Sequence, residues 1–391
     1  MSMRSKLPDV GTTIFSVISR RAIEFDAMNV GQGFPDFPID PLLAQCVTEA
    51  MAQGQNQYAQ GDGVPELREA IAAKLADAHG IMVDPRASIT VTCGATEALF
   101  STIQAMVHPG DEVLVFDPAY DSYEPAVRLA GGRCIRIPLL PPSFAFDFDR
   151  VRAALTERTR LVIVNTPHNP ACVAHDRSVL DTLAEVLRGR DIWILSDEVY
   201  EHTVFDGRAH TSVLAHPELR ERTFAVFSFG KTLHVTGWRV GYCVATPPLM
   251  AEFRKVHQFN TFSIATPLQR GIARYLKQRP ASWSELAGFF QRKRDLLTTL
   301  LEGSGFRPLP TQGTYFQLLD YSELTDQDDV GFSDRLIREA GVALIPLSPF
   351  YRERPDTRLL RICFAKRDET LEAAAQRLRE FALRSAASAL A

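Results

Sequence analysis

The sequence predicts an α/β protein with a mostly parallel central sheet, followed by a smaller α+β part. Three observations support this prediction. Short apolar, β-rich runs alternate with amphipathic segments between residues 88 and 228. The runs are apolar almost throughout, as expected for parallel strands that helices cover on both faces. After about residue 250 the pattern changes to long helical periodicities and then to short strands.

The elements of the first part follow in order along the chain. The first 45 residues are rich in Pro and Gly and are predicted to be irregular. Residues 65–79 are predicted to form a helix, with Pro65 in its first turn, apolar Leu67 and Ile71 on one face, and Gly80 as its stop. Strands are predicted at 88–93, 112–116, 161–165, 192–197 and 223–228, with a strand of odd direction at 241–245.

The second part is predicted to mix helices and short strands. A long helix covers 281–302, strands cover 314–320, 342–347 and 359–364, and a last helix covers 368–383. We therefore expect a large α/β domain over 46–280 and a small α+β domain over 281–391. Residues 1–45 are expected to pack on the small domain.

Composition excludes several classes of function. The formal net charge of −4 offers no basic field for a nucleic acid. None of the six cysteines forms a C-x-x-C pair, which favours reduced thiols in a cytoplasmic protein over disulfides or a metal site. No run of 18 apolar residues is present and the N-terminus lacks an apolar signal core, so we expect neither a membrane segment nor a secretory signal.

Chemically distinctive residues follow five of the predicted strands directly. The carboxyl ends of parallel strands meet at one edge of a sheet, where ligands bind, so these residues are expected to line one rim. In chain order they are Gly94, Ala95 and Thr96; Tyr120; Asn169; Asp197 and Tyr200; and Ser228 and Lys231.

Taken singly, these residues have ordinary interpretations. Gly94 can open a tight turn, Asp197 can cap a helix, and Asn169 before a proline is most simply a turn residue. Two nucleotide motifs also fail. The segment ending in Gly230-Lys231-Thr232 has Ala at 225 where a P-loop needs Gly, and Gly31-Gln32-Gly33 has Asp at 36 where a dinucleotide fingerprint needs its third Gly.

Taken together, the residues match the needs of one cofactor. Pyridoxal 5'-phosphate needs a lysine for its imine, an acid beside the pyridine nitrogen, donors for the phenolic oxygen, a ring to stack on, and a phosphate cup. The rim supplies one of each.

The chain resembles class I aminotransferases of the fold-type-I pyridoxal-phosphate family, and most of all the methionine and kynurenine/glutamine aminotransferase branch. The resemblance covers nearly the whole chain. It rests on GQGFPDF (31–37), NQYAQGDG (56–63), TCGATEAL (92–99), FDPAYDSYEP (116–125), NTPHNP (165–170), SDEVYEH (196–202), SFGKTLHVTGWRVGY (228–242) and RICFAK (361–366).

The resemblance implies a role for each site residue. Lys231 would form the imine, Asp197 would pair with the pyridinium, Tyr200 and Asn169 would contact the phenolic oxygen, and Tyr120 would stack on the ring. The phosphate would be held by Gly94, Ala95, Thr96, Ser228 and Arg239, with Tyr58 reaching across from the second subunit of a homodimer. The substrate carboxylate would meet Arg361, Asn169 and the backbone of Gly33.

The chain departs from the family pattern at two places. Ala171-Cys172-Val173 follows NTPHNP where small residues and Gly are common, and position 93 is Cys. The first departure puts the shape of that loop in doubt, and neither affects an assigned role.

The expected reaction moves the amino group of an amino acid to a 2-oxo acid. A β-lyase is the alternative, because elimination uses the same cofactor machinery. A cofactor-sensing regulator is disfavoured, because no basic helix-turn-helix pattern occurs and little chain precedes residue 30. We expect methionine and large neutral or aromatic donors, because apolar residues flank the predicted pocket: Phe15, Phe34, Tyr58, Tyr120, Phe259 and Phe262.

Overall fold

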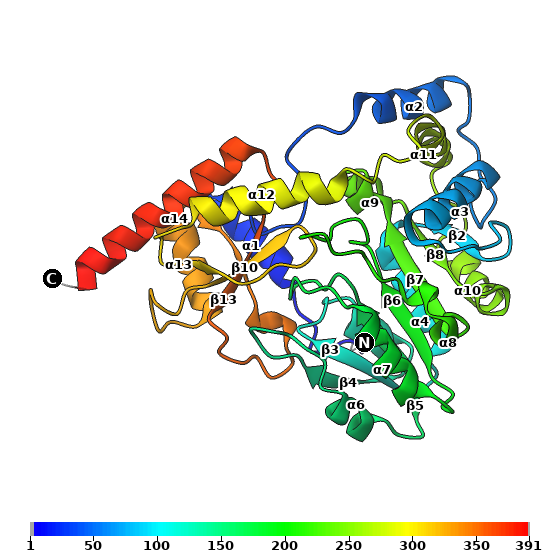
Figure 1. Ribbon diagram of the computed structural model, residues 1–391, viewed down its shortest axis with the longest axis horizontal. Helices are drawn as coiled ribbons and strands as arrows, with labels where there is room; N and C mark the ends of the chain where they lie inside the picture. Colours follow the sequence, from blue (N-terminus) through cyan, green and yellow to red (C-terminus); the bar gives the residue numbers. More distant parts are fainter. Residues whose placement is uncertain (1–3, 390–391) are drawn as a thin grey trace.

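A seven-stranded sheet forms the centre of the computed structural model, which describes residues 4–389 (Figure 1). Its order is β2-β8-β7-β6-β5-β3-β4. β8 runs antiparallel to both neighbours and the other pairs are parallel, so the mostly parallel sheet and the odd direction of 241–245 are confirmed. The strands are β2 (Ile89–Thr92), β3 (Glu112–Asp117), β4 (Arg133–Pro138), β5 (Thr159–Asn165), β6 (Trp193–Asp197), β7 (Thr223–Ser228) and β8 (Gly241–Val244).

Two apolar cores cover the two faces of this sheet. Along β5, Leu161 and Ile163 enter one core while Val162 and Val164 enter the other, because successive side chains of a strand point to opposite faces. The first core includes residues of α4 (Gly94–Met106) and α10 (Pro247–Asn260). The second includes residues of α3 (Pro65–His79) and α7 (Arg177–Leu187). Helices on both faces explain why the strands are apolar almost throughout.

The helix predicted at 65–79 forms with the predicted bounds, and Gly80 ends it in the left-handed conformation at φ 66°. The edge strand β4 is not among the predicted strands. Only Cys134 and Ile137 of its six residues are buried, and it carries Arg133 and Arg136, so it lacks the continuous apolar run of the inner strands.

The N-terminal region contains more regular structure than expected. The prediction of an irregular segment is wrong for α1 (Ile14–Glu24), β1 (Met28–Asn29) and the start of α2 (Pro41–Ala52). Tertiary packing stabilises both helices. β1 pairs with β11 (Val342–Ala343), and α1 packs against β11. The helix α2 packs along α11 (Thr266–Gln278), and the two lie side by side in Figure 1. Gly271 allows the close approach of α2, because a Cβ there would lie 2.3 Å from Val47 Cγ2.

A second, antiparallel sheet has the order β12-β13-β10-β9. It contains β9 (Arg307–Pro308), β10 (Phe316–Asp320), β12 (Ile345–Pro346) and β13 (Leu359–Cys363). The strand predicted at 342–347 is divided between β11 and β12, which belong to different sheets. The helices α12 (Leu286–Leu300) and α13 (Asp329–Ala340) both pack on α14 (Asp368–Ala389). The domain boundaries near 45 and 280 stay a prediction.

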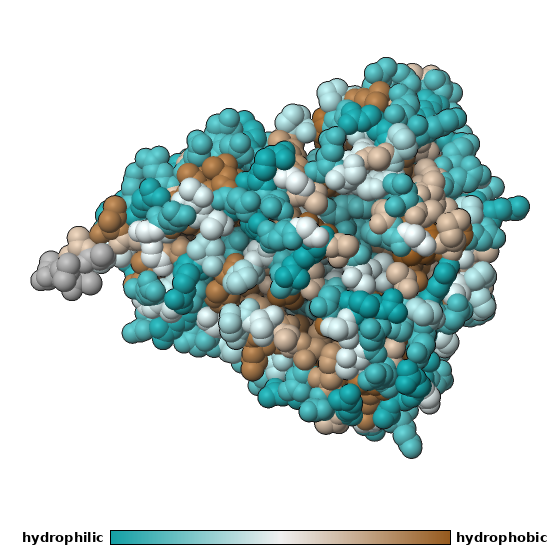
Figure 2. Space-filling view, viewed as in Figure 1, coloured by the Kyte–Doolittle hydropathy of each residue, from teal (hydrophilic) through white to brown (hydrophobic). Residues whose placement is uncertain are grey.

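Shorter elements complete the chain and several of them carry site residues. They are α5 (Tyr123–Leu129), α6 (Phe148–Ala154), α8 (Pro217–Arg220), α9 (Phe229–Thr232), η1 (Val213–Ala215), η2 (Thr236–Trp238) and η3 (Ser348–Phe350). The face shown in Figure 2 is mostly hydrophilic, with apolar side chains in scattered groups. Within residues 4–389, no helix is both long and apolar enough to cross a membrane.

Candidate active site

The five predicted strand ends meet at one cavity of about 150 Å³. The last residues of the parallel strands β5, β6 and β7 line this cavity, together with the first turn of α4. The prediction that these strand ends share a rim is therefore confirmed. The lining residues are Ala95, Thr96, Leu99, Tyr120, Asn165, Asn169, Asp197, Val199, Tyr200, Ser228, Lys231 and Arg239.

Lys231 lies in the short helix α9, directly after β7. Its amine donates to the hydroxyl of Tyr315 at 2.7 Å and contacts the Gly33 carbonyl oxygen at 3.4 Å. Burial lowers the pKa of Lys231 to about 8, and the positive charges of Arg361 and Arg239 act in the same direction. With a pKa of about 8, about a tenth of this amine is neutral at pH 7, the form that a nucleophile or proton acceptor needs.

Asp197 ends β6 and is 4% exposed. Burial raises the pKa of its carboxyl to about 6, although the Tyr123 hydroxyl donates to Oδ2 at 2.7 Å. Val199 N–H adds only a long contact of 3.4 Å to Oδ1. The carboxylate faces the cavity and forms no ion pair with a described residue, although the charge of Lys231 acts on it and lowers its pKa. A cationic ring nitrogen placed beside it would restore its ordinary ionisation.

The first turn of α4 and Arg239 form a cradle suited to an anion. Gly94 has φ 68°, and a Cβ there would lie 2.7 Å from Nη2 of Arg239. Arg239 itself has φ 55°, and its guanidinium contacts Thr96 Oγ1 at 3.4 Å and the Thr236 carbonyl at 3.1 Å. Free N–H groups at a helix start together with a guanidinium match the needs of a phosphate.

The amide and phenol side chains of the cavity are held by their neighbours. Asn165 donates to the Asp197 carbonyl at 2.8 Å and accepts from the Asn169 N–H at 2.7 Å, which ties two strand ends together. Tyr200 is buried with its ring edge against Tyr315 at 5.1 Å, and burial raises the pKa of its hydroxyl, so it stays protonated. Tyr120 lines the cavity with its ring against that of Tyr123 at 5.7 Å.

The segment that carries Asp197 and Tyr200 is anchored from behind. Lys74 of α3 reaches Glu201 at 2.5 Å, and His79 reaches the same carboxylate at 2.6 Å. These side chains are almost fully buried, so removing one partner would leave an uncompensated charge. The network fixes the loop after β6, and with it the direction of the two site residues.

Arg361 lies in β13, far along the chain from the rim, and is 1% exposed. Its Nη1 donates to Asn169 Oδ1 at 2.5 Å and its Nη2 to the Gly31 carbonyl at 3.1 Å. The guanidinium lies 3.8 Å from the centre of the Phe316 ring. Its Nε has no hydrogen-bond partner among the described residues. A buried guanidinium with a free donor fits an incoming carboxylate.

The loop that includes Gly31 and Gly33 closes the site from the N-terminal side. The Gly33 carbonyl accepts from the Tyr315 hydroxyl at 2.7 Å. A Cβ at Gly33 would lie 2.5 Å from Phe316 Cζ, so only glycine fits this position. The structure thus brings Gly33, Arg361 and Lys231 into one region from three distant parts of the sequence.

Three of the aromatic residues expected near the pocket lie on the surface of the single chain. Tyr58, Phe259 and Phe262 are 83%, 88% and 56% exposed. The ring of Tyr58 contacts that of Phe262 at 5.2 Å and is not part of the cavity lining. The expectation that these residues flank the pocket is therefore wrong within one chain, and the role of Tyr58 across a dimer stays a prediction.

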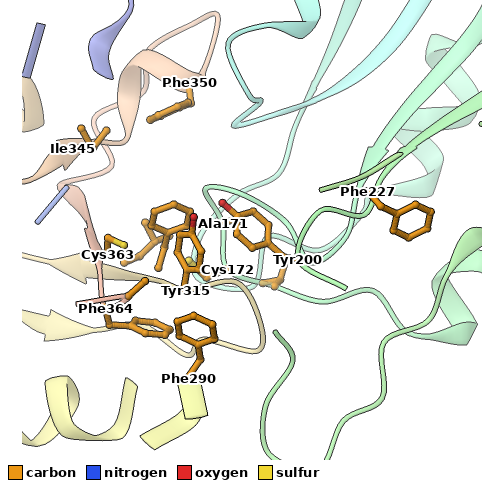
Figure 3. Close-up of a cluster of buried hydrophobic side chains, with 14 of the residues drawn as sticks. Ala171, Cys172, Tyr200, Phe227, Phe290, Tyr315, Ile345, Phe350, Cys363 and Phe364 are labelled. Carbon is orange, nitrogen blue, oxygen red and sulfur yellow. The ribbon is translucent and has the colours of Figure 1, made fainter. Parts of the chain in front are cut away.

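Besides the apolar lining residues Leu99 and Val199, sequence reasoning missed three residues whose polar groups contact the predicted site residues. Tyr123 and Asn165 lie within the phrases FDPAYDSYEP and NTPHNP, so their neighbourhood was visible but their contacts were not. Tyr315 precedes β10 and has no signal of its own, because its partners come from elsewhere in the chain. Figure 3 shows its ring beside that of Tyr200, with Phe290 close by.

Comparison with known proteins agrees with this geometry. The family model for aminotransferase class I and II matches residues 26–378. The methionine aminotransferase of Escherichia coli is 50% identical over 96% of this chain and 98% of its own length. Human kynurenine–oxoglutarate transaminase 1 is 31% identical over 92% of this chain and 93% of its own length.

A solved structure shows the same fold. The crystal structure of YbdL from Escherichia coli, described as having a methionine aminotransferase function, superposes with a TM-score of 0.95 at 50% identity, covering 97% of this chain and 100% of that one. These matched proteins transfer amino groups, which supports transamination over the β-lyase alternative. The chain therefore belongs to the class I and II aminotransferase family and is an aminotransferase.

Proposed function

We propose that this aminotransferase holds pyridoxal 5'-phosphate in the cavity at the strand ends. The observation that carries the proposal is that a lysine of lowered pKa, a buried carboxylate of raised pKa and an anion cradle face one cavity. When bound, the cofactor supplies an aldehyde for an amine and a ring that withdraws electrons from the substrate's α-carbon. The residues that would hold it are Gly94, Ala95, Thr96, Tyr120, Asn169, Asp197, Tyr200, Ser228, Lys231 and Arg239.

Lys231 would act as the covalent anchor and as the base. Its amine is partly neutral near neutral pH, so Nζ can accept the proton that leaves the substrate's α-carbon and can donate it again later in the reaction. The Asp197 carboxylate would keep the cofactor's pyridine nitrogen protonated. The Tyr123 hydroxyl, at 2.7 Å from Oδ2, fixes the direction of that carboxylate.

Arg361 would bind the α-carboxylate of the amino acid and of the 2-oxo acid. A guanidinium meets a carboxylate through two parallel hydrogen bonds, which sets the orientation of the α-carbon as well as the affinity. Asn169 and the carbonyl of Gly31 hold the guanidinium in place. The backbone of Gly33, in the same loop, would contact the same carboxylate.

The preferred donors would be methionine and other large neutral or aromatic amino acids. The rings of Phe15, Phe316 and Phe350 surround Arg361, with centres at 5.2, 3.8 and 5.8 Å from its guanidinium carbon. A dicarboxylate donor would need a second arginine. Arg21 is paired with Asp334, and Arg270 is paired with Glu66 away from the cavity. The 50% identity to a methionine aminotransferase supports the same preference.

A homodimer with shared active sites would explain the exposed aromatic residues. Tyr58 and Phe262 form a pair on the surface of one chain, and Phe259, three residues before Phe262, is 88% exposed. An exposed aromatic cluster of this kind suits an interface between two copies. In such a dimer Tyr58 would reach the phosphate end of the partner's cavity.

The test is substitution of the lysine. Lys231→Ala should lose the absorbance of the covalently bound cofactor and all measurable transamination from methionine. A screen of methionine, phenylalanine, glutamine and aspartate with one acceptor acid should rank aspartate last. Turnover by Lys231→Ala, or a borohydride-trapped cofactor on another lysine, would refute the assignment.

A further inference from the structure

Tyr315 contacts both Lys231 and the loop that includes Gly31 and Gly33. It lies directly before β10 and is 1% exposed. Its ring is packed edge-on against Tyr200 at 5.1 Å, with Phe290 at 5.6 Å (Figure 3). It is also packed edge-on against Phe316 at 5.0 Å. A ring held on several sides cannot swing away, so its hydroxyl has one fixed position.

The hydrogen bonds of this hydroxyl have a defined direction. A carbonyl oxygen can only accept, so Tyr315 donates its proton to Gly33 O at 2.7 Å. The phenolic oxygen is then left as an acceptor for the Lys231 amine, also at 2.7 Å. Burial raises the pKa of the phenol well above its usual range, so Tyr315 keeps its proton and the direction does not reverse.

The same contacts connect the lysine to the proposed carboxylate site. Gly33 belongs to the loop whose Gly31 carbonyl accepts from Arg361 at 3.1 Å. A chain of contacts therefore runs from Arg361 through this loop and Tyr315 to Lys231. One rigid phenol thus fixes the amine relative to the guanidinium, although Lys231 lies in α9, after β7 of the seven-stranded sheet, and Arg361 lies in β13 of the four-stranded sheet.

We propose that Tyr315 is the positioning residue of Lys231, directing its amine at the substrate's α-hydrogen through the hydrogen bond that the phenolic oxygen accepts. The inference rests on the proposed role of Lys231 as the base. In the step it serves, the α-carbon loses a proton, Lys231 Nζ gains it, and Tyr315 gains and loses none. The hydroxyl acts by geometry alone.

The experiment compares Tyr315→Phe with the matched control Tyr321→Phe. Tyr321 is equally buried at the other end of β10, and its hydroxyl donates to the Gln327 carbonyl at 2.9 Å, away from the cavity. Each variant loses one phenolic hydroxyl and keeps its ring. We measure cofactor content from its absorbance, kcat and KM for methionine, and the isotope effect with α-deuterated methionine.

A misdirected base slows proton transfer more than binding. Tyr315→Phe is expected to keep a full complement of cofactor, to lower kcat roughly 10- to 100-fold with KM changed less than about threefold, and to enlarge the α-deuterium isotope effect. The absorbance titration of the bound cofactor against pH should also shift, because the lysine nitrogen loses a partner. Tyr321→Phe should match the wild type in all five measurements: cofactor content, kcat, KM, the isotope effect and the pH titration.

Unchanged kcat and isotope effect in Tyr315→Phe would overturn the proposal while leaving the role of Lys231 intact. Tyr315→Met, which keeps a large apolar side chain without a ring or a hydroxyl, is the second variant. If both Tyr315 variants fail to fold while Tyr321→Phe folds, the hydroxyl serves the fold and the proposal is also overturned. Turnover by Lys231→Ala would instead refute the proposed function itself.

Discussion

Replacing Arg361 by lysine tests the carboxylate site most directly. Arg361→Lys keeps the charge but removes the planar fork that now joins Asn169 Oδ1 at 2.5 Å and the Gly31 carbonyl at 3.1 Å. An ammonium can reach one oxygen of a substrate carboxylate where the guanidinium reaches two. The variant therefore loses one charge-assisted hydrogen bond, worth about 1.5–3 kcal/mol. At about 1.4 kcal/mol per factor of ten, kcat/KM should fall roughly 10- to 100-fold.

The assay compares methionine with 3-(methylthio)propylamine, which has the same side chain and no carboxylate. Arg361→Lys should lower kcat/KM for methionine and leave the slow reaction of the amine within about twofold. Arg294→Lys is the matched control, because Arg294 also lies over an aromatic ring, Phe205, and is paired with Asp206 at 2.7 Å far from the cavity. An equal loss with both substrates, or no loss with methionine, would refute the carboxylate role.

Three further predictions follow from the site. Asp197→Asn should cut kcat at least about a hundredfold while the cofactor still binds, since its charge matters most when the ring takes up electrons; an unchanged rate would leave Asp197 with a structural role alone. Reaction of the cofactor-free protein with added pyridoxal phosphate should rise with pH, with a midpoint near the pKa of about 8 of Lys231, because only the neutral amine attacks; a rate independent of pH between about 6 and 9 would contradict the lowered pKa. Tyr58→Phe should weaken cofactor affinity in a protein that sediments as a dimer, and an active monomer would exclude the shared site.

The sequence predicted the cofactor side of the site well, for a physical reason. Parallel strands deliver their carboxyl ends to one edge of a sheet, so residues that follow separate strands are neighbours without any knowledge of the rest of the fold. Asn169, Asp197 and Lys231 are placed by that rule alone, and the structure brings them to one cavity. Gly94, the first residue of α4, could also be predicted from the sequence, because the strand-to-helix turn there has φ 68° and favours glycine.

The rest was decided by packing between distant elements. Apolar periodicity reports which face of an element is buried and not what covers it, so it did not reveal α1 against β11 or the half-exposed strand β4. In the sequence, nothing separates Tyr315 and Tyr123 from other tyrosines. Only the structure shows that their hydroxyls contact Lys231 and Asp197. Arg361 was assigned through family resemblance, and only the tertiary structure supplied its partners, because the Gly31 carbonyl that holds it is 330 residues away along the chain.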